Sequence, residues 1–85
     1  MREIILDCST ISCAKQLHKA LKEALQFPEW YGHNLDALFD CLTDLTEETL
    51  LVLLHWDQTA AYCRGFESAF ADAAMENPLF TYTIL

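Results

Sequence analysis

The sequence predicts an α/β protein in which a small three-stranded parallel sheet packs with about four helices. Three short runs, residues 3–7, 49–55 and 80–84, have the length and the apolar or β-branched composition of strands. Two helical patterns lie between each strand and the next, which gives the order β-α-α-β-α-α-β. Strands joined by helical crossovers pair in parallel with right-handed connections, so we expect the three runs to form one sheet.

Length and composition suit a single domain over residues 1–85. A chain of 85 residues is too short for two ordinary domains, and its hydrophobic fraction of 53% is enough to fill one modest core. Two glycines and two prolines are too few for a chain dominated by loops or disorder.

The first helix is expected between Ser12 and Leu25. The hydroxyl of Ser12 is a suitable N-cap, because it can accept a hydrogen bond from a free backbone N–H of the first turn. Leu17, Leu21 and Leu25 recur at helical spacing and should face the core.

A connector then leads to a second helix over residues 35–43. Gly32 permits a turn with positive φ, because glycine adopts that conformation without a steric penalty. Asn34 is expected to cap the helix. The predicted buried face consists of Leu35, Leu38 and Leu42.

The second half of the chain repeats the alternation of strand and helices. Residues 49–55 are almost entirely apolar, which is typical of a strand buried on both faces of a parallel sheet. Residues 57–64 predict a short helix and residues 66–76 a longer one, which ends before Pro78 because proline cannot continue a helix. The last strand is expected over residues 80–84.

The chain is strongly acidic. Thirteen Asp and Glu stand against five Lys and Arg, for a formal net charge of −8. Phosphate binding requires clustered cations, so nucleic acid and anionic membranes are poor partners. A basic protein is the partner that this charge would attract.

The N-terminus lacks the features of a secretory signal. Its apolar run covers only Ile4 to Leu6, and no stretch of the chain has the length of a membrane span. We therefore expect a cytoplasmic protein that is a monomer when free. Its four cysteines, which we expect to be reduced thiols, are Cys8, Cys13, Cys41 and Cys63.

Carboxylates gather around the second predicted helix. Asp36 and Asp40 share one side of it with Thr43, away from the leucines. Like charges four residues apart cost an isolated helix about 0.2–0.5 kcal/mol. Residues 29–48 contain six carboxylates and no Lys or Arg. A solvated acidic face is the commonest fate of such residues, and a protein interface is the alternative.

Aromatic residues next to these carboxylates favour the interface. Trp30 and Tyr31 precede the helix, and Phe39 lies between its apolar and acidic sides. Protein interfaces are enriched in aromatic anchors. For Tyr31, packing in the core is an equally good explanation.

Residues 28–43, PEWYGHNLDALFDCLT, closely resemble the signature of the barstar family, the intracellular inhibitors of the ribonuclease barnase. The family pattern is PEYYGENLDALWDCLT. The match has no gap and includes both aspartates. The family's fold, a three-stranded parallel sheet with helices, agrees with the elements predicted above, so the resemblance extends over the whole chain.

The resemblance implies an inhibitor whose second helix and preceding loop block the active site of a basic, extracellular-type ribonuclease. Its carboxylates would take the places of substrate phosphates among the enzyme's cationic groups. By position, Asp40 matches the central anion, Asp36 the second one, and Trp30 an aromatic residue that packs on the catalytic groups. The other predicted contact positions are Gly32, Asn34, Leu35, Phe39, Thr43, Asp44 and, on a later helix, Asp72.

Several positions depart from the family pattern. Trp30 replaces a Tyr, His33 a Glu and Phe39 a Trp, whereas Asp44 and Leu45 stand where the family has Gly and Trp. These changes affect the rim of the predicted contact, so the cognate ribonuclease need not be barnase.

Three other functions are open at this point. Asp36 and Asp40 could be an acid/base pair of an enzyme, although a short convex helix offers no cleft. Cys8, Cys13 and His18 have a spacing at the margin of metal-binding patterns, although no cofactor or metal is otherwise implied. The third alternative is a barstar-fold binding or immunity module for a basic partner that is not a ribonuclease.

Overall fold

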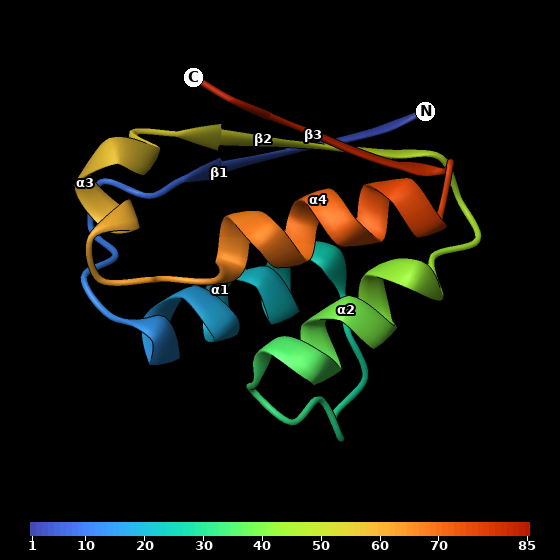
Figure 1. Cartoon of the computed structure of the whole chain (residues 1–85), viewed down its shortest axis with the longest axis horizontal. Helices are drawn as coiled ribbons and strands as arrows, with labels where there is room; N and C mark the ends of the chain where they lie inside the picture. The colour runs from blue at the N-terminus through green and yellow to red at the C-terminus, as the bar shows by residue number, and fades with distance from the viewer.

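The computed structural model describes all residues from 1 to 85 and contains seven elements in the predicted order (Figure 1). The strands are β1 (Arg2–Asp7), β2 (Thr49–Leu54) and β3 (Phe80–Ile84), and the helices are α1 (Ala14–Leu25), α2 (Leu35–Thr43), α3 (Trp56–Ala60) and α4 (Phe66–Glu76). The α/β class with four helices is thereby confirmed.

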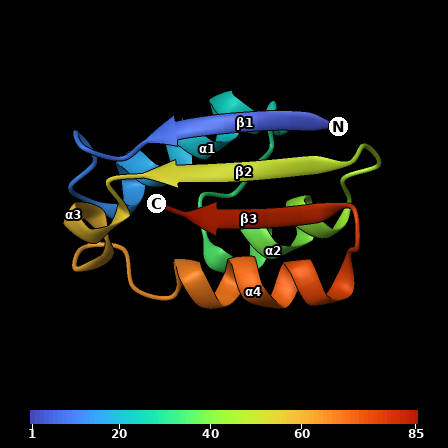
Figure 2. The same cartoon turned by 90° about the horizontal axis from the view of Figure 1, so that it is seen from above.

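The three strands form one parallel sheet with β2 at its centre, as Figure 2 shows. Ile5 of β1 is level with Val52 of β2, which is level with Thr83 of β3. The predicted pairing is confirmed, although β2 ends at Leu54 rather than at residue 55.

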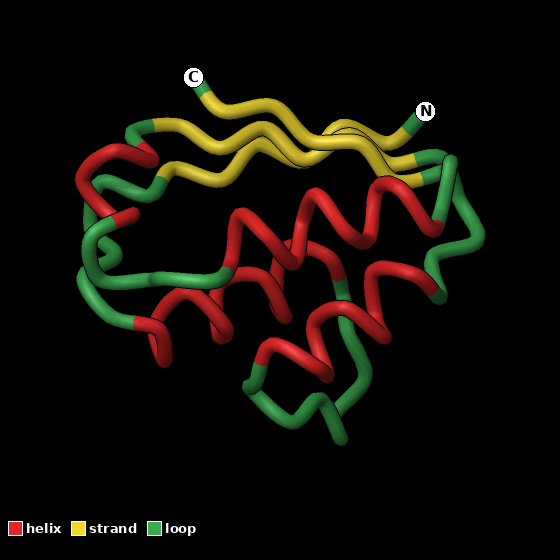
Figure 3. The backbone as a smooth tube through the Cα atoms, in the orientation of Figure 1, coloured by secondary structure: helices red, strands yellow, loops and turns green.

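The helices α1, α2 and α4 lie on one side of the sheet, and α3 lies beyond the ends of β1 and β2 (Figures 1 and 3). α1 packs against β1 and α4 against β3, whereas α2 packs mainly against α4. The core between them contains the fully buried rings of Phe66, Phe70 and Phe80. α2 is therefore far from the sheet, with its outer side free.

Helices cover only one face of the sheet (Figure 1), so the expected burial of residues 49–55 on both faces is only partly confirmed. Leu51 and Leu53 are fully buried. On the opposite face Val52 is buried, at 8% exposure, and Leu50 and Leu54 are half-buried. The strand order β1-β2-β3 does not reverse. The connections from β1 to β2 and from β2 to β3 both step across the sheet in the same direction. When both are right-handed, their helices lie on the same face of the sheet.

The start of α1 also differs from the prediction. Cys13, not Ser12, is the N-cap, and its side chain makes no capping hydrogen bond. The side-chain oxygen of Gln16 instead accepts from the backbone N–H of Ser12 at 2.8 Å and from its hydroxyl at 3.3 Å. This contact orders the start of the helix from inside the first turn.

The helix predicted at residues 57–64 is shorter than expected. α3 ends at Ala60, and the backbone N–H of Tyr62 donates to the carbonyl of Thr59 at 2.9 Å, which closes a turn. The buried hydroxyl of Thr59 lies 2.7 Å from the carbonyl oxygen of Cys8, so α3 is tied to the loop after β1. None of the four helices combines the length and apolar character needed to cross a membrane.

In the connector, where Gly32 would permit a turn with positive φ, the left-handed residue is His33, with φ 51°. The glycine with positive φ is Gly65, with φ 88°, at the N-cap of α4. A Cβ atom there would lie 2.7 Å from Cδ1 of Leu35, the first residue of α2. Gly65 therefore permits both the left-handed turn and the close approach of the two helix starts.

We expect Gly65→Ala to lower the free energy of unfolding by about 1–2 kcal/mol, because the left-handed conformation is unfavourable for residues with a Cβ. The flexible end of Leu35 can turn away, so the backbone conformation should set most of this cost. Urea unfolding in the natural and Leu35→Ala backgrounds should therefore show similar losses. If the loss vanishes with Leu35→Ala, the side-chain contact and not the backbone is responsible.

Candidate protein-binding face

Two asparagine side chains fix the ends of α2. Asn34 Oδ1 accepts from the backbone N–H of Ala37 at 2.7 Å, which confirms the predicted cap. At the other end, buried Asn77 points Nδ2 at the carbonyl oxygens of Leu42 and Leu45, at 3.0 and 3.1 Å. Sequence reasoning misses this second role, because the bonded residues are more than 30 positions apart.

The apolar side of α2 is only partly as predicted. Leu38 and Leu42 are fully buried, but Leu35 is 36% exposed. Leu35 is in the first turn, beside Gly65, where α4 presents backbone and no side chain to cover it. Its exposure makes it available to a partner.

Three aspartates form a row on the exposed side of α2 and its C-cap. Asp36, Asp40 and Asp44 follow one another at intervals of four residues, and all are exposed. Both ion pairs of the structure lie elsewhere, so none of the three carboxylates has a cationic group within 4.0 Å. The row is thus an acidic surface that the chain itself does not neutralise.

α4 adds to this surface. Asp72 is exposed and lines a hollow of about 280 Å³ together with Phe39, Met75 and Glu76. The structure therefore brings Asp72 to the side of α2. Sequence reasoning misses Met75, which is 84% exposed, and Glu76, although their spacing of three and four residues from Asp72 places them on the same helix face.

The two aromatic residues before α2 have opposite environments. Trp30 is 74% exposed, whereas Tyr31 is 5% exposed. The hydroxyl of Tyr31 lies 2.6 Å from Nδ1 of His18 on α1. Core packing therefore accounts for Tyr31, and Trp30 is the residue available for binding.

The remaining predicted residues lie along the same segment. Gly32 and Asn34 are exposed, and Phe39 is half-buried against the core. The Thr43 hydroxyl lies 3.0 Å from the backbone carbonyl oxygens of Phe39 and Asp40, so its proton is directed back into the helix. Its oxygen is still available to accept a hydrogen bond.

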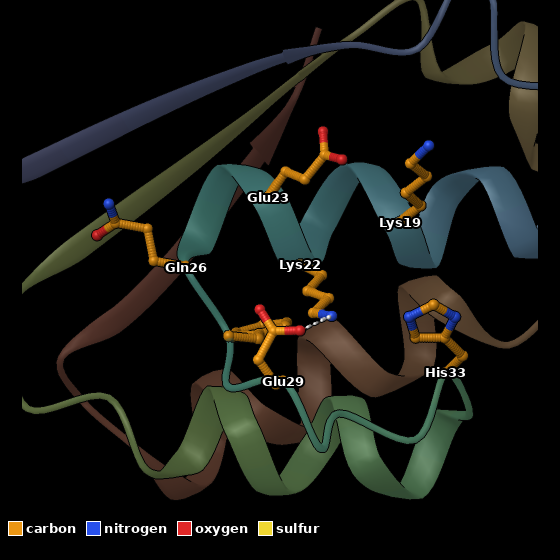
Figure 4. Close-up of a pocket in the computed structure, with 7 residues that line it drawn as sticks. Lys19, Lys22, Glu23, Gln26, Glu29 and His33 are labelled. Atoms are coloured by element: carbon orange, nitrogen blue, oxygen red, sulfur yellow. Dashed lines mark hydrogen bonds and ion pairs between the residues drawn. The ribbon is translucent and has the colours of Figure 1, made fainter.

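The largest hollow of the molecule lies between α1 and the connector before α2, and Figure 4 shows it. Its volume is about 470 Å³, and Lys22 Nζ lies 3.5 Å from Glu29 Oε2 within it. The lining residues are Lys19, Lys22, Glu23, Gln26, Phe27, Glu29 and His33. The hollow mixes both charges and contains no nucleophile beside a base, so it has no catalytic arrangement of that kind.

Three rings tie the connector to α1. His18 is buried, its ring is stacked on that of His33 at a centroid distance of 5.9 Å, and its Nδ1 faces the Tyr31 hydroxyl. Burial lowers the pKa of His18 below its usual 6.5, and the charge of His33 lowers it further. The neutral ring is therefore the form that suits the folded protein.

This environment predicts a loss of stability in weak acid. The unfolded chain binds a proton at His18 more readily than the folded chain, so the free energy of unfolding should fall as the pH drops below about 6.5. Asp7, whose pKa is lowered to about 2 by the backbone N–H of Ser9 and by His55, should add a second loss between about pH 4 and pH 2.

Urea unfolding from pH 8 to pH 2 measures these changes, with His18→Gln as the control. The variant should show a smaller loss between pH 7 and pH 5 than the natural chain. An identical pH dependence in both proteins would contradict the role of His18.

The structure contains no group of three or more His, Cys, Asp or Glu side chains that could hold a metal ion. Cys8, Cys13 and His18 are therefore not assembled into a ligand set. All four cysteines are free, and burial raises the pKa of the Cys8 thiol to about 11. Such a thiol is a small apolar side chain rather than a nucleophile.

The fold and the site define a class: a small α/β protein whose outermost helix presents unneutralised carboxylates beside an exposed tryptophan, a surface suited to a basic protein. The chain belongs to the barstar (barnase inhibitor) family, whose model matches residues 1–78. It is 38% identical over 76 residues to a protein of Bacillus subtilis (strain 168) named "Putative ribonuclease inhibitor YrdF". The aligned region covers 89% of this chain and 80% of the relative. Members of the barstar family are inhibitors, so the chain is not an enzyme.

Proposed function

We propose that the chain inhibits a basic ribonuclease by inserting α2 and the connector before it into the enzyme's active site. One observation carries the proposal in this barstar-family chain. Asp36, Asp40 and Asp44 form an exposed row without an internal counter-charge, next to an exposed Trp30. An acidic surface of this kind is complementary to the cationic pocket that binds RNA phosphates.

The carboxylates would replace phosphates. Ribonucleases hold phosphate oxygens with cationic donors, and an aspartate offers two oxygens to the same donors. Asp40 lies in the middle of α2, so it would enter the centre of the contact, where water is excluded. Asp36 would bind nearer to the edge.

Other residues would shape the contact around these anions. Trp30 would pack on the catalytic groups of the enzyme. Phe39 of α2 and Asp72 of α4, which line one hollow, would also contact the enzyme. The connector and the first and last turns of α2 would supply Gly32, Asn34, Leu35, Thr43 and Asp44.

We also propose the setting of this interaction. The 85 residues would act as one domain and as a monomer in the cytoplasm, where the inhibitor would protect the cell from an extracellular-type ribonuclease before its export. The net charge of −8 would accelerate encounter with a basic enzyme, most strongly at low salt.

A titration of the purified chain into barnase, with hydrolysis of a fluorogenic RNA substrate as the readout, tests the proposal. We expect activity to fall linearly to a 1:1 end point when both proteins are at micromolar concentration. Heat-denatured chain at the same concentrations controls for nonspecific acidic protein. If the chain inhibits neither barnase nor other basic ribonucleases, the partner is a different basic protein.

A further inference from the structure

A third hollow lies between the connector and the C-terminal end of α2, and Trp30 and Asp44 both line it. Its volume is about 250 Å³, below the roughly 300–1,000 Å³ of small-molecule sites, so its size suits a single side chain. The other lining residues are Leu25, Gln26, Phe27, Pro28, Cys41 and Leu45. The walls are therefore mainly apolar.

Asp44 contributes the one carboxylate of this hollow, and no Lys, Arg or His lines it. Its position is unfavourable within the chain. It is the C-cap of α2, where the helix dipole repels anions, and the last turn contains no basic residue. It also follows Asp40 by four residues and has no ion-pair partner. The carboxylate thus lacks compensation inside the molecule.

Trp30 supplies the other feature of the hollow. Its side chain is 74% exposed, although tryptophan is usually well buried. An indole face attracts cations, and a carboxylate in the same hollow attracts them as well. Apolar walls would pack against the methylene groups that carry such a cation.

We propose that this hollow binds an arginine side chain of the partner ribonuclease, an inference that rests on the proposed function. The guanidinium would lie between the Trp30 ring and the Asp44 carboxylate, with its aliphatic stem against the apolar walls. Arginine fits better than lysine, because its planar and weakly hydrated head stacks on aromatic rings and pairs with carboxylates through two hydrogen bonds. The hollow is continuous with the proposed interface, since Asp44 follows Asp40 by one helical turn.

A titration with N-acetyl-arginine amide tests the hollow without any ribonuclease. The chain has two tryptophans, so the indole N–H signals of Trp30 and of Trp56, which is 3% exposed, can be followed together by NMR. We expect a saturable shift of Trp30 alone, with a dissociation constant of about 10 mM, since one side chain makes few contacts. Asp44→Asn should weaken this binding at least about threefold, because it removes the charge and keeps the shape. N-acetyl-norleucine amide should bind more weakly than the arginine amide.

A second measurement uses the complex and a matched pair of variants. Asp44→Asn and Glu48→Gln each replace a carboxylate by an amide, but Glu48 does not line the hollow. Asp44→Asn should weaken binding to the inhibited ribonuclease about five- to tenfold, and Glu48→Gln should change it less than about twofold. Asp44→Asn should also raise the melting temperature by roughly 1–4 °C, because it removes an unfavourable charge at the helix end. If Asp44 served only to stabilise the fold, Asp44→Asn would lower the melting temperature.

The outcomes separate this proposal from the proposed function. If the chain inhibits the ribonuclease but Asp44→Asn and Glu48→Gln behave alike, the arginine site is wrong and the inhibitor role stands. If the chain inhibits no ribonuclease, the titration with arginine amide still decides whether the hollow binds arginine. Equal binding of norleucine and arginine amides, or no saturable shift of Trp30, would overturn the site.

Discussion

Asp40→Ala should weaken binding to the ribonuclease by well over 2 kcal/mol, or more than about 30-fold, mainly through faster dissociation. Asp40 lies in the middle of α2 and has no counter-charge inside the chain. In the complex several cationic donors would converge on it, and its removal would leave them buried without an anion. The size of this effect is taken from interface hot spots, for which barstar is itself a standard example.

Two further variants make the result specific. Glu48→Gln removes the same charge from the exposed loop beyond α2 and should mainly slow association, by a factor that shrinks as salt rises. The loss of affinity for Asp36→Ala should lie between those of Asp40→Ala and Glu48→Gln. Asp36 shares the exposed side of α2 with Asp40 but lies nearer to the end of the helix. Surface binding at two salt concentrations measures both rate constants. If Asp40→Ala and Glu48→Gln lose affinity equally, the proposed insertion of α2 is wrong, and the acidic face only attracts the enzyme at long range.

Asn77→Ala should lower the free energy of unfolding by about 2–4 kcal/mol, the largest loss of stability that we expect from one polar side chain. Its amide nitrogen serves the carbonyl oxygens of Leu42 and Leu45, and its Oδ1 accepts from the backbone N–H of Leu79 at 3.0 Å. Truncation would leave the carbonyl oxygen of Leu45 and the backbone N–H of Leu79 without a protein partner in a partly buried place, and the carbonyl of Leu42 would keep only the N–H of Leu45 at 3.4 Å. Urea unfolding measures the loss.

Asn34→Ala is the matched control at the opposite end of α2. This exposed cap makes one bond to the helix, to Ala37, so its loss should cost only about 1 kcal/mol. Asn77→Asp, which keeps the shape but removes the donor, should destabilise at least as much as Asn77→Ala. If Asn34→Ala proves the more damaging substitution, Asn77 does not hold the end of α2.

Local patterns were enough to predict the sheet and most helix limits. The apolar run of β2 and the leucine spacing of α1 each depend on residues close in sequence, and their periodicity determines which side is buried. Asn34 as the cap of α2 is equally local, because its bonded residue is three positions away. The match to the barstar signature added the assignment of Asp36 and Asp40 to an interface.

Features that depend on distant contacts could not be predicted in this way. Leu35 has the spacing of a buried residue, but it is exposed because Gly65, thirty positions later, brings only backbone beside it. The role of Asn77 depends on carbonyl groups of another helix. Trp30 and Tyr31 are adjacent aromatic residues, and their different burial depends on contacts that Tyr31 makes, which include its hydrogen bond to His18 on α1 and its ring packing on Phe27.

Competition by an active-site nucleotide is the most direct test of the claim that carboxylates of α2 take the place of substrate phosphates. The affinity of the chain for the ribonuclease that it inhibits would be measured by calorimetry at increasing concentrations of a nucleoside 3′-monophosphate, at constant ionic strength. If both ligands occupy the same site, the apparent dissociation constant should rise about 100-fold when the nucleotide is present at 100 times its own dissociation constant. An unchanged affinity at saturating nucleotide, with nucleotide and chain bound together, would contradict the account.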